Sequence, residues 1–465
     1  MSAPLILGTN SIKDTGYNVD NSLRFNRGSS DSLSDTQTSG NRRTWTFSTW
    51  VKKCTNGNGV TGAIHGLMSA LTSDYDGIHF HNTDAFRVYF NGTSSGLLVT
   101  NRLFRDNSAF YHTVVAVDTT QGTASNRVKI YINGVQETSF STETYPSQNY
   151  DTFYNVSNTA RVGRVEGSFY LDGYMSEVVF IDGQQLDPTS FGEFDEDSGI
   201  WKPIDVSGLT FGTNGFYLDF ENSGSLGADV SGNGNNFTVN NLTAIDQTTD
   251  TPTNNFATGN PLDYSGTAPT LGNGNLSITS AELSDKPFRT TIAVSQGKWY
   301  MEYKCEKSGS DNDNHIGLWS AENSLTSNYV GYQLYSWGIF TGNGNKRNNQ
   351  SYDSYGSAIA QNDIVMIALD KDNGKIWWGK NGTWFASGNP ATGSNEAFSN
   401  INTVVGSNGF VSFCFLPQQK FSLNFGSPPF TISSGNTDGN GYGNFEYAVP
   451  SGYYSLNSKN LAEYG

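Results

Sequence analysis

The acidic run Glu193-Phe194-Asp195-Glu196-Asp197 comes nearest in this sequence to a hydrolytic carboxylate set. Acids at alternate positions of one strand point to the same side, and such a set can cleave a glycosidic bond with a nucleophile and a general acid. Here the run follows a proline-containing turn, lies outside any apolar strand and lacks flanking aromatic residues that could line a cleft. We interpret it as a solvated acidic loop, assign no catalytic residue and expect the protein not to be an enzyme.

Metal-ligand chemistry has two weak candidates. His79 and His81 alternate in a strand and could form half of a metal site, but no third ligand accompanies them, so a structural role is favoured. Asp311 and Asp313 lie in an oxygen-rich loop and are the candidate calcium ligands. The run Asp370–Gly374 resembles the start of a calcium loop, yet it fits a hairpin turn equally well. Apart from this candidate calcium, we expect no cofactor.

The segment 329–337 contains more aromatic rings than one inward strand face can hold, and a long polar loop follows it at 343–350. Sugars stack on exposed rings and accept or donate hydrogen bonds to neighbouring amides. A second interpretation stays open, in which the rings cover the sandwich or pack on a neighbouring subunit. The candidate ligand-binding residues are Tyr332, Tyr335, Trp337, Asn343, Asn345, Arg347 and Tyr352.

Short strands must position these residues. The chain has 52 glycines and 13% aromatic residues but only 15% charged residues, a composition that favours strands and tight turns over long helices. Two blocks share a pattern: a strand ending in Asp (111–118 and 363–370), a turn, and a strand ending in Asn-Gly (133–134 and 381–382). Because Asn-Gly favours hairpin reversal, we predict an all-β chain of two antiparallel, jelly-roll-like β-sandwiches in tandem.

Changes in amino-acid composition and strand pattern along the chain set the expected domain boundaries. We predict a first sandwich at 21–203, an ordered connector rich in Asn, Gly and Thr at 204–275, and a second sandwich at 276–430. Residues 1–20 form an N-terminal segment that could serve attachment. The tail 431–465 is too aromatic to be disordered, so we expect it to pack on the body or on a partner. Trp377 and Trp378 are consecutive and face opposite sides of their sheet, so one of them must lie outside the sandwich core.

The net charge and the absence of recognisable targeting signals limit the expected classes of partner and the expected site of synthesis. A net charge of −16 argues against nucleic acid and against an anionic membrane surface. Three cysteines cannot build a disulfide framework, and the first residues lack the basic region and long apolar run of an export signal. We also expect no membrane insertion, because no segment is apolar for long enough. Synthesis in a reducing cytoplasm and release by cell lysis are therefore expected.

The order of the strand motifs resembles two known folds. The first block is similar to laminin-G-like, concanavalin A-like sandwiches, and the second is similar to SPRY domains. The first resemblance rests on 22–25, 44–52, 111–118, 131–135, 161–163 and 172–178. The second rests on 297–303, 315–319, 362–370, 374–382, 411–415 and 421–426. Both folds are binding scaffolds in most settings, and the fold alone does not fix the ligand.

The tandem arrangement, with Asp250–Phe256 between the two blocks, looks like virion proteins of marine tailed bacteriophages. That resemblance implies a tail fibre, a tail-tip protein or a capsid-decorating appendage, located in the virion after synthesis in the host cytoplasm. It also implies a homo-oligomer that contacts other virion proteins and a glycan or protein of the host surface. The alternatives are a secreted bacterial lectin and, with less support, a polysaccharide depolymerase.

Overall fold

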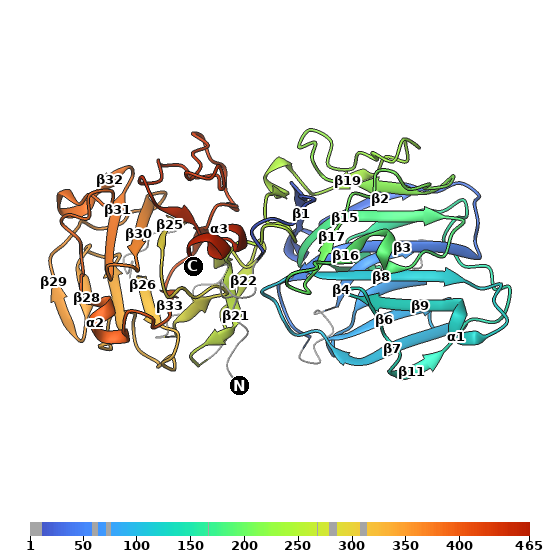
Figure 1. The fold of residues 1–465 in the computed structure, drawn as a ribbon, viewed down its shortest axis with the longest axis horizontal. Helices are drawn as coiled ribbons and strands as arrows, with labels where there is room; N and C mark the ends of the chain where they lie inside the picture. The colour runs from blue at the N-terminus through green and yellow to red at the C-terminus, as the bar shows by residue number, and fades with distance from the viewer. Residues whose placement is uncertain are drawn as a thin grey trace. The chain divides into compact units, whose positions relative to one another are not determined.

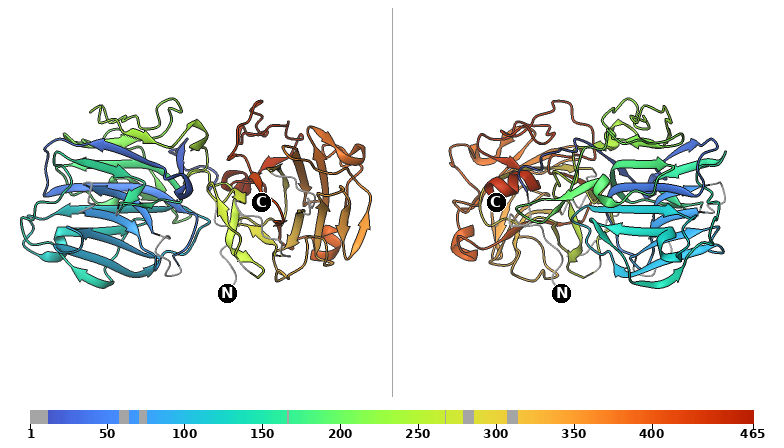
Figure 2. Two further views of the ribbon diagram at one scale, coloured as in Figure 1. Left: turned by 180° about the vertical axis from the view of Figure 1, so that it is seen from behind. Right: turned by 45° about the vertical axis from the view of Figure 1, so that its right-hand side comes forward.

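The computed structural model of this chain describes residues 12–57, 64–70, 76–165, 167–266, 268–278, 286–306 and 314–465. It is all-β with stacked antiparallel sheets, which confirms the predicted fold class. The chain divides into an N-terminal unit, Thr15–Thr253, and a C-terminal unit that comprises Asn254–Gly465 and the described residues 12–14. Figures 1 and 2 show that strands form layers in each unit. None of the helices in the described part of the chain combines the length and apolarity needed to span a bilayer.

Two sheets face each other in the N-terminal unit, and all of their strand pairs are antiparallel. The first sheet has the order β10 (Val135–Gln136), β9 (Val128–Ile132), β8 (Tyr111–Asp118), β3 (Thr44–Lys53), β15 (Gly173–Asp182), β1 (Ser22–Phe25) and β20 (Gln247–Thr248), and β18 (Phe216–Leu218) also pairs with β15. The second has the order β11 (Phe140–Thr144), β7 (Gly96–Leu103), β6 (Ala85–Phe90), β5 (Asp76–Phe80), β4 (His65–Ala70), β12 (Thr159–Val162), β2 (Ser32–Thr36) and β19 (Thr238–Asn240). Smaller elements are β13 (Arg164–Val165) with β14 (Phe169–Tyr170), β16 (Gly192–Phe194) with β17 (Trp201–Pro203), α1 (Ala124–Arg127), η2 (Arg27–Ser29), η4 (Pro188–Ser190) and η5 (Ala244–Asp246).

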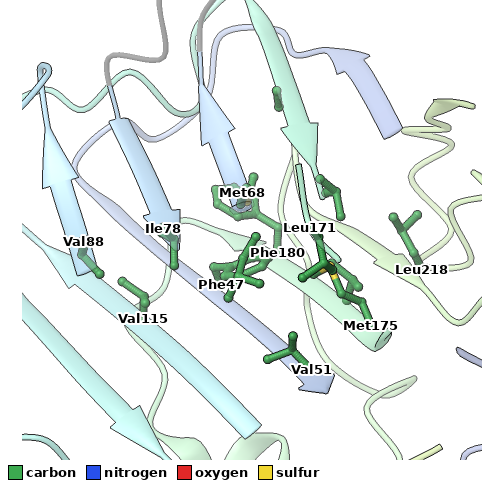
Figure 3. Close-up of a cluster of buried hydrophobic side chains, with 14 of the residues drawn as sticks. Phe47, Val51, Met68, Ile78, Val88, Val115, Leu171, Met175, Phe180 and Leu218 are labelled. Carbon is green, nitrogen blue, oxygen red and sulfur yellow. The ribbon is translucent and has the colours of Figure 1, made fainter. Parts of the chain in front are cut away.

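Alternate residues of these strands fill the space between the sheets. Phe47 and Val51 of β3 belong to the same core cluster as Met68 of β4 and Ile78 of β5, and all four side chains are fully buried (Figure 3). Burying one such side chain stabilises the fold by roughly 1.5–3 kcal/mol. The strand alternation read from the sequence therefore places one face of each strand in a common core.

The C-terminal unit is a second pair of sheets. One has the order β21 (Gly259–Tyr264), β24 (Phe288–Thr290), β33 (Val411–Leu416), β26 (His315–Ser320), β27 (Ser336–Phe340), β28 (Lys346–Asn348) and β29 (Ser351–Asp353). The other has the order β22 (Leu271–Gly272), β23 (Ser277–Ile278), β34 (Phe421–Asn424), β25 (Lys298–Cys305), β30 (Ile364–Asp370), β31 (Lys375–Lys380) and β32 (Thr383–Trp384), and β35 (Tyr454–Ser455) pairs in parallel with β25. The helical turns are η6 (Phe385–Ser387), α2 (Ile401–Val405) and α3 (Ser458–Tyr464).

The C-terminal tail covers the outer face of the second of these sheets. Trp378 packs in the core between the sheets, whereas Trp377 lies on the opposite face beneath Phe445 and Tyr453 of the tail. The tail is held by the buried carboxylate of Glu302, whose oxygens accept the backbone N–H groups of residues 446 and 447 at 3.0 and 2.8 Å. The two adjacent tryptophans thus face opposite sides as predicted, and the tail packs on its own unit.

The stretch 204–275 differs from the connector that we predicted. β18, β19 and β20 extend the sheets of the N-terminal unit, and β21 and β22 belong to the sheets of the C-terminal unit. The division falls between Thr253 and Asn254. Several of these strands are only two or three residues long and alternate with Asn- and Gly-rich turns, so the composition resembles that of a connector although its strands complete two sheets.

Candidate functional site

One face of the sheet that ends at β29 carries a row of aromatic and cationic side chains. Cross-strand register places His315 of β26 opposite Phe340 of β27, and Arg347 of β28 opposite Tyr352 of β29. Side chains alternate between the two faces of a strand, so residues in between, such as Trp337, point to the core instead. The row lies on the outer face of the sandwich.

A two-residue turn brings Arg347 to Tyr352. Asn349 and Gln350 have φ values of 49° and 64°, the left-handed conformation that both central residues of a type I′ hairpin require. Asn349 tolerates this conformation better than most residues do. The turn fixes the register of β28 and β29 and therefore sets the guanidinium beside the phenol ring.

Aromatic rings surround the Arg347 guanidinium. Its carbon lies 4.2 Å from the Phe340 ring centre, 4.3 Å from that of Tyr352 and 4.9 Å from that of Tyr329. Each such contact is worth about 0.5–1 kcal/mol at a partly exposed site. The rings therefore hold the guanidinium in place before any ligand arrives.

The neutral imidazole ring of His315 contacts the Arg347 guanidinium. Its Nε2 lies 3.3 Å from Arg347 Nη1 and its Nδ1 lies 3.3 Å from the carbonyl oxygen of Val330. Burial, and then the positive charge of Arg347, lower the pKa of His315 to about 3. A neutral ring with its proton on Nδ1 donates to Val330 and accepts from Arg347, which satisfies both contacts.

The exposed end of this cluster is Tyr352, of which 46% is accessible to solvent. Tyr329 joins it to the loop before β27, because Tyr329 lies 6.0 Å from the Tyr352 ring and 5.2 Å from the Tyr332 ring. We call this set the β26–β29 surface, and it consists of His315, Tyr329, Tyr332, Phe340, Arg347 and Tyr352. It offers ring faces for stacking and guanidinium N–H groups for hydrogen bonds, which suits a sugar ring or a planar side chain.

The structure brings together some of the predicted ligand-binding residues. Tyr332, Arg347 and Tyr352 share the β26–β29 surface. Tyr335 is half-buried against Trp319, with 5.8 Å between the ring centres.

The remaining predicted residues lie apart from that cluster. Asn343 and Asn345 form the turn between β27 and β28, where the Asn343 side chain accepts the N–H of residue 345 at 2.9 Å. The prediction for Trp337 is wrong: its ring is fully buried and its Nε1 donates to Asn400 at 2.8 Å. The alternation of β27 turns this ring inward, which the sequence of an aromatic-rich segment does not reveal.

The metal candidates receive no support from the described part of the chain. Asp311 and Asp313 lie outside the described residues. Over the ranges that the structure describes, no group of three or more His, Cys, Asp and Glu side chains is arranged to hold a metal ion. His79 is buried and stacks on His81 with 5.9 Å between ring centres.

The acidic run of 193–197 takes part in local structure. Asp195 accepts hydrogen bonds from the Ser198 hydroxyl and backbone, and Lys202 Nζ contacts Glu193 and Asp195 at 3.4 and 3.3 Å. These hydrogen bonds lower the pKa of Asp195 to about 2, so it cannot serve as a general acid near neutral pH. Among the four acidic residues of the run, only Glu193 lies within a strand, the short β16 that pairs with β17.

Sequence reasoning missed Tyr329, His315 and Phe340 as members of the surface. Strand parity could have found two of them, because His315 pairs with Phe340 across β26 and β27 on the same face as Arg347. Tyr329 begins the aromatic-rich segment 329–337, but it lies outside the strands, so strand alternation does not show that it reaches this cluster.

Comparisons with known proteins agree with the two-unit architecture. Residues 26–186 match the concanavalin A-like lectin/glucanases superfamily, and residues 298–428 match the SPRY domain. The ATP-dependent RNA helicase DDX1 of Xenopus laevis is 30% identical over 174 residues, which are 37% of this chain and 21% of the helicase. The chain therefore spans about a fifth of the length of this curated relative.

Two solved structures are similar to parts of this chain at low sequence identity. The SPRY domain of human HERC1 covers 36% of this chain and 96% of its own, with 16% identity and a TM-score of 0.29. A heptameric pentraxin of Limulus polyphemus covers 36% of this chain and 78% of its own, with 16% identity and a TM-score of 0.28. From the matched residues, the chain carries a concanavalin A-like lectin/glucanase domain followed by a SPRY domain.

Proposed function

We propose that this protein is a non-catalytic binding protein that contacts a surface glycan or protein through the β26–β29 surface of its SPRY domain. The observation that carries the proposal is the ordered guanidinium of Arg347 beside the exposed ring of Tyr352. A side chain that is already held by three rings loses little conformational freedom on binding, which favours affinity. The concanavalin A-like match of the N-terminal unit adds a second domain of a superfamily that contains lectins.

Substitution of Tyr352 tests this proposal directly. Tyr352→Ala removes the exposed ring without opening the core, so we expect binding to host surface extracts or a glycan array to fall at least tenfold. Tyr264→Ala is the matched control, because Tyr264 is 37% exposed and lies on β21, the opposite edge strand of the same sheet. Equal binding by both variants and the unaltered protein would refute the assignment of this surface.

We further propose that the protein is a component of a bacteriophage particle, as a tail fibre, tail-tip protein or capsid-decorating appendage. The tandem order of the two domains supports this setting. Electron microscopy of particles labelled with an antibody against the chain tests it, and labelled tails or capsids are the expected result. Detection in the secreted fraction of uninfected bacteria, with unlabelled particles, would favour a bacterial lectin instead.

The same proposal includes the absence of turnover. In the described structure the Asp195 carboxylate of the acidic run is engaged by Ser198 and Lys202, which supports a structural role for this residue. Incubation with laminarin, agar or a host capsular glycan should release no reducing ends. Sustained release, abolished in a variant of Glu193, would establish a depolymerase in place of a binding protein.

A further inference from the structure

Asn-Gly pairs recur along this chain, and they carry a reactivity of their own. The backbone nitrogen of the glycine can attack the side-chain carbonyl carbon of the asparagine before it, because the glycine has no Cβ that hinders the approach. The asparagine side chain must turn towards that nitrogen for the bond to form. Hydrogen bonds to the side-chain amide therefore decide which pairs can react in the folded protein.

Hydrogen bonds hold the asparagine side chain in both predicted hairpin turns. Asn381 Oδ1 accepts the N–H of residue 364 at 2.9 Å, and its Nδ2 donates to Asp363 at 2.7 Å. Asn133 Oδ1 accepts the N–H of His112 at 2.8 Å. These side chains keep the hairpins in place and are restrained from turning towards the glycine.

Most other Asn-Gly pairs of the described chain are restrained in the same way. The Nδ2 group donates to a backbone carbonyl in Asn56, Asn214 and Asn233. It donates to a side chain in Asn91, Asn273, Asn373 and Asn440. In Asn343 it is Oδ1 that accepts a backbone N–H.

Asn408 differs from all of them. It is exposed in the turn between α2 and β33, and among the Asn-Gly pairs that the structure describes it alone has a side-chain amide without a hydrogen bond. The next residue, Gly409, is buried, and a Cβ in its place would lie 1.9 Å from the carbonyl oxygen of Val405. The fold therefore requires glycine at this position, which keeps the reactive pair in the turn.

The backbone on both sides of Asn408 is already positioned. The carbonyl oxygen of Ser407 accepts from the buried Lys371 ammonium at 2.9 Å. The N–H of Gly409 donates to the carbonyl of Gly406 at 3.2 Å, the long limit of such bonds. Reaction at Asn408 therefore needs the rotation of one exposed side chain and the loss of one weak hydrogen bond, without opening of the sandwich.

From this arrangement we propose that Asn408 is a site of spontaneous deamidation in the folded protein. The nitrogen of Gly409 attacks Cγ of Asn408, so the N–Cγ bond forms, the Cγ–Nδ2 bond breaks, and ammonia leaves with the proton of the glycine nitrogen. Water then opens the resulting cyclic imide at one of its two carbonyl carbons and gives aspartate or isoaspartate. The net reaction takes up one water molecule, releases one ammonia molecule and adds one negative charge at neutral pH.

Peptide mapping by mass spectrometry tests the proposal on the full-length, folded protein after ageing in mildly alkaline buffer. The peptide with Asn408 should gain the mass difference between a hydroxyl and an amino group, and part of it should contain isoaspartate. Asn381 is the internal control, because its reaction must break two hydrogen bonds instead of one weak bond. Conversion at Asn408 should therefore be about tenfold faster than at Asn381. Conversion at Asn408 that is no faster would overturn the proposal.

A denatured sample and one variant show whether the fold selects the site. In denaturant both peptides should convert at similar rates, because the hydrogen bonds of Asn381 are lost; protection of Asn381 that persists there would refute the role of those bonds. Asn408→Gln lengthens the side chain by one methylene group and makes ring closure slower. The aged variant should lose the acidic form that ion-exchange chromatography separates from the unaltered protein. Formation of that acidic form at an unchanged rate would place the modification elsewhere.

Discussion

The buried histidine of β8 makes the N-terminal unit sensitive to acid. His112 accepts the indole N–H of Trp201 on Nδ1 at 3.0 Å, and its Nε2 lies 2.9 Å from the Ser48 hydroxyl. The ring also stacks on Trp50 with 4.7 Å between ring centres. Burial lowers the pKa of His112 to about 3, because the charged ring would lose the solvation that it has in water.

The size of the effect follows from linkage. In the unfolded chain a histidine has a pKa of about 6.5, so between pH 6.5 and pH 3 the unfolded state binds a proton that the folded state does not. Stability from this group is therefore fully present above pH 6.5 and is lost as the pH falls. One such histidine costs about 1.4 kcal/mol per pH unit within that window, which amounts to about 2 kcal/mol between pH 7 and pH 5.

His112→Gln separates this effect from other titrations, because glutamine keeps an acceptor and a donor but does not titrate. Hydrogen exchange of the β8 amides, corrected for intrinsic pH dependence, measures the free energy of opening. From pH 7 to pH 5 it should fall by about 2 kcal/mol less in the variant than in the unaltered protein. His81→Gln is the control, with a smaller change, because His81 is only half-buried. Identical pH dependence in His112→Gln and the unaltered protein would refute the reasoning.

Three further outcomes concern packing and buried charge. Asp84→Ala leaves the buried Lys53 ammonium without its carboxylate and should destabilise the N-terminal unit by about 3–5 kcal/mol in denaturant titrations; a cost below about 1 kcal/mol would contradict the pairing. Trp377→Ala empties a fully buried site beneath the tail and should lower the stability of the C-terminal unit by about 3–5 kcal/mol, measured by calorimetry. Glu302→Ala removes the acceptor of two tail N–H groups, so limited proteolysis should cut the tail faster than in the unaltered protein, while unchanged cleavage would argue against this anchor.

The turns and the strand alternation were accessible from the sequence because both depend on local chemistry. Asn133 and Gly134 have φ values of 49° and 77°, and Asn381 and Gly382 have values of 50° and 83°, so both Asn-Gly pairs form the predicted reversals. The opposite orientation of Trp377 and Trp378 followed from strand periodicity alone.

What the sequence could not provide depends on contacts between distant segments. Asp250 follows β20 by a few residues and contacts Ser22 and Lys52 in the folded chain. Nothing in the sequence around Asp250 reveals these two neighbours. For the candidate surface, the cluster around Arg347 combines four strands with one loop, and the path of that loop decides which rings stay exposed. Trp337 illustrates the limit, because one residue of register separates a buried ring from an exposed one.

The covering of β25 by the tail has a consequence for dividing this protein experimentally. A fragment that stops where the SPRY match stops, at residue 428, would lose Phe445 and Tyr453, which pack against Tyr300 and Trp377. It would expose contiguous aromatic surface and an unpaired strand edge, both of which promote aggregation. Insolubility of such a fragment would indicate that the sheet needs the covering tail. A soluble SPRY fragment of this chain should therefore extend through α3.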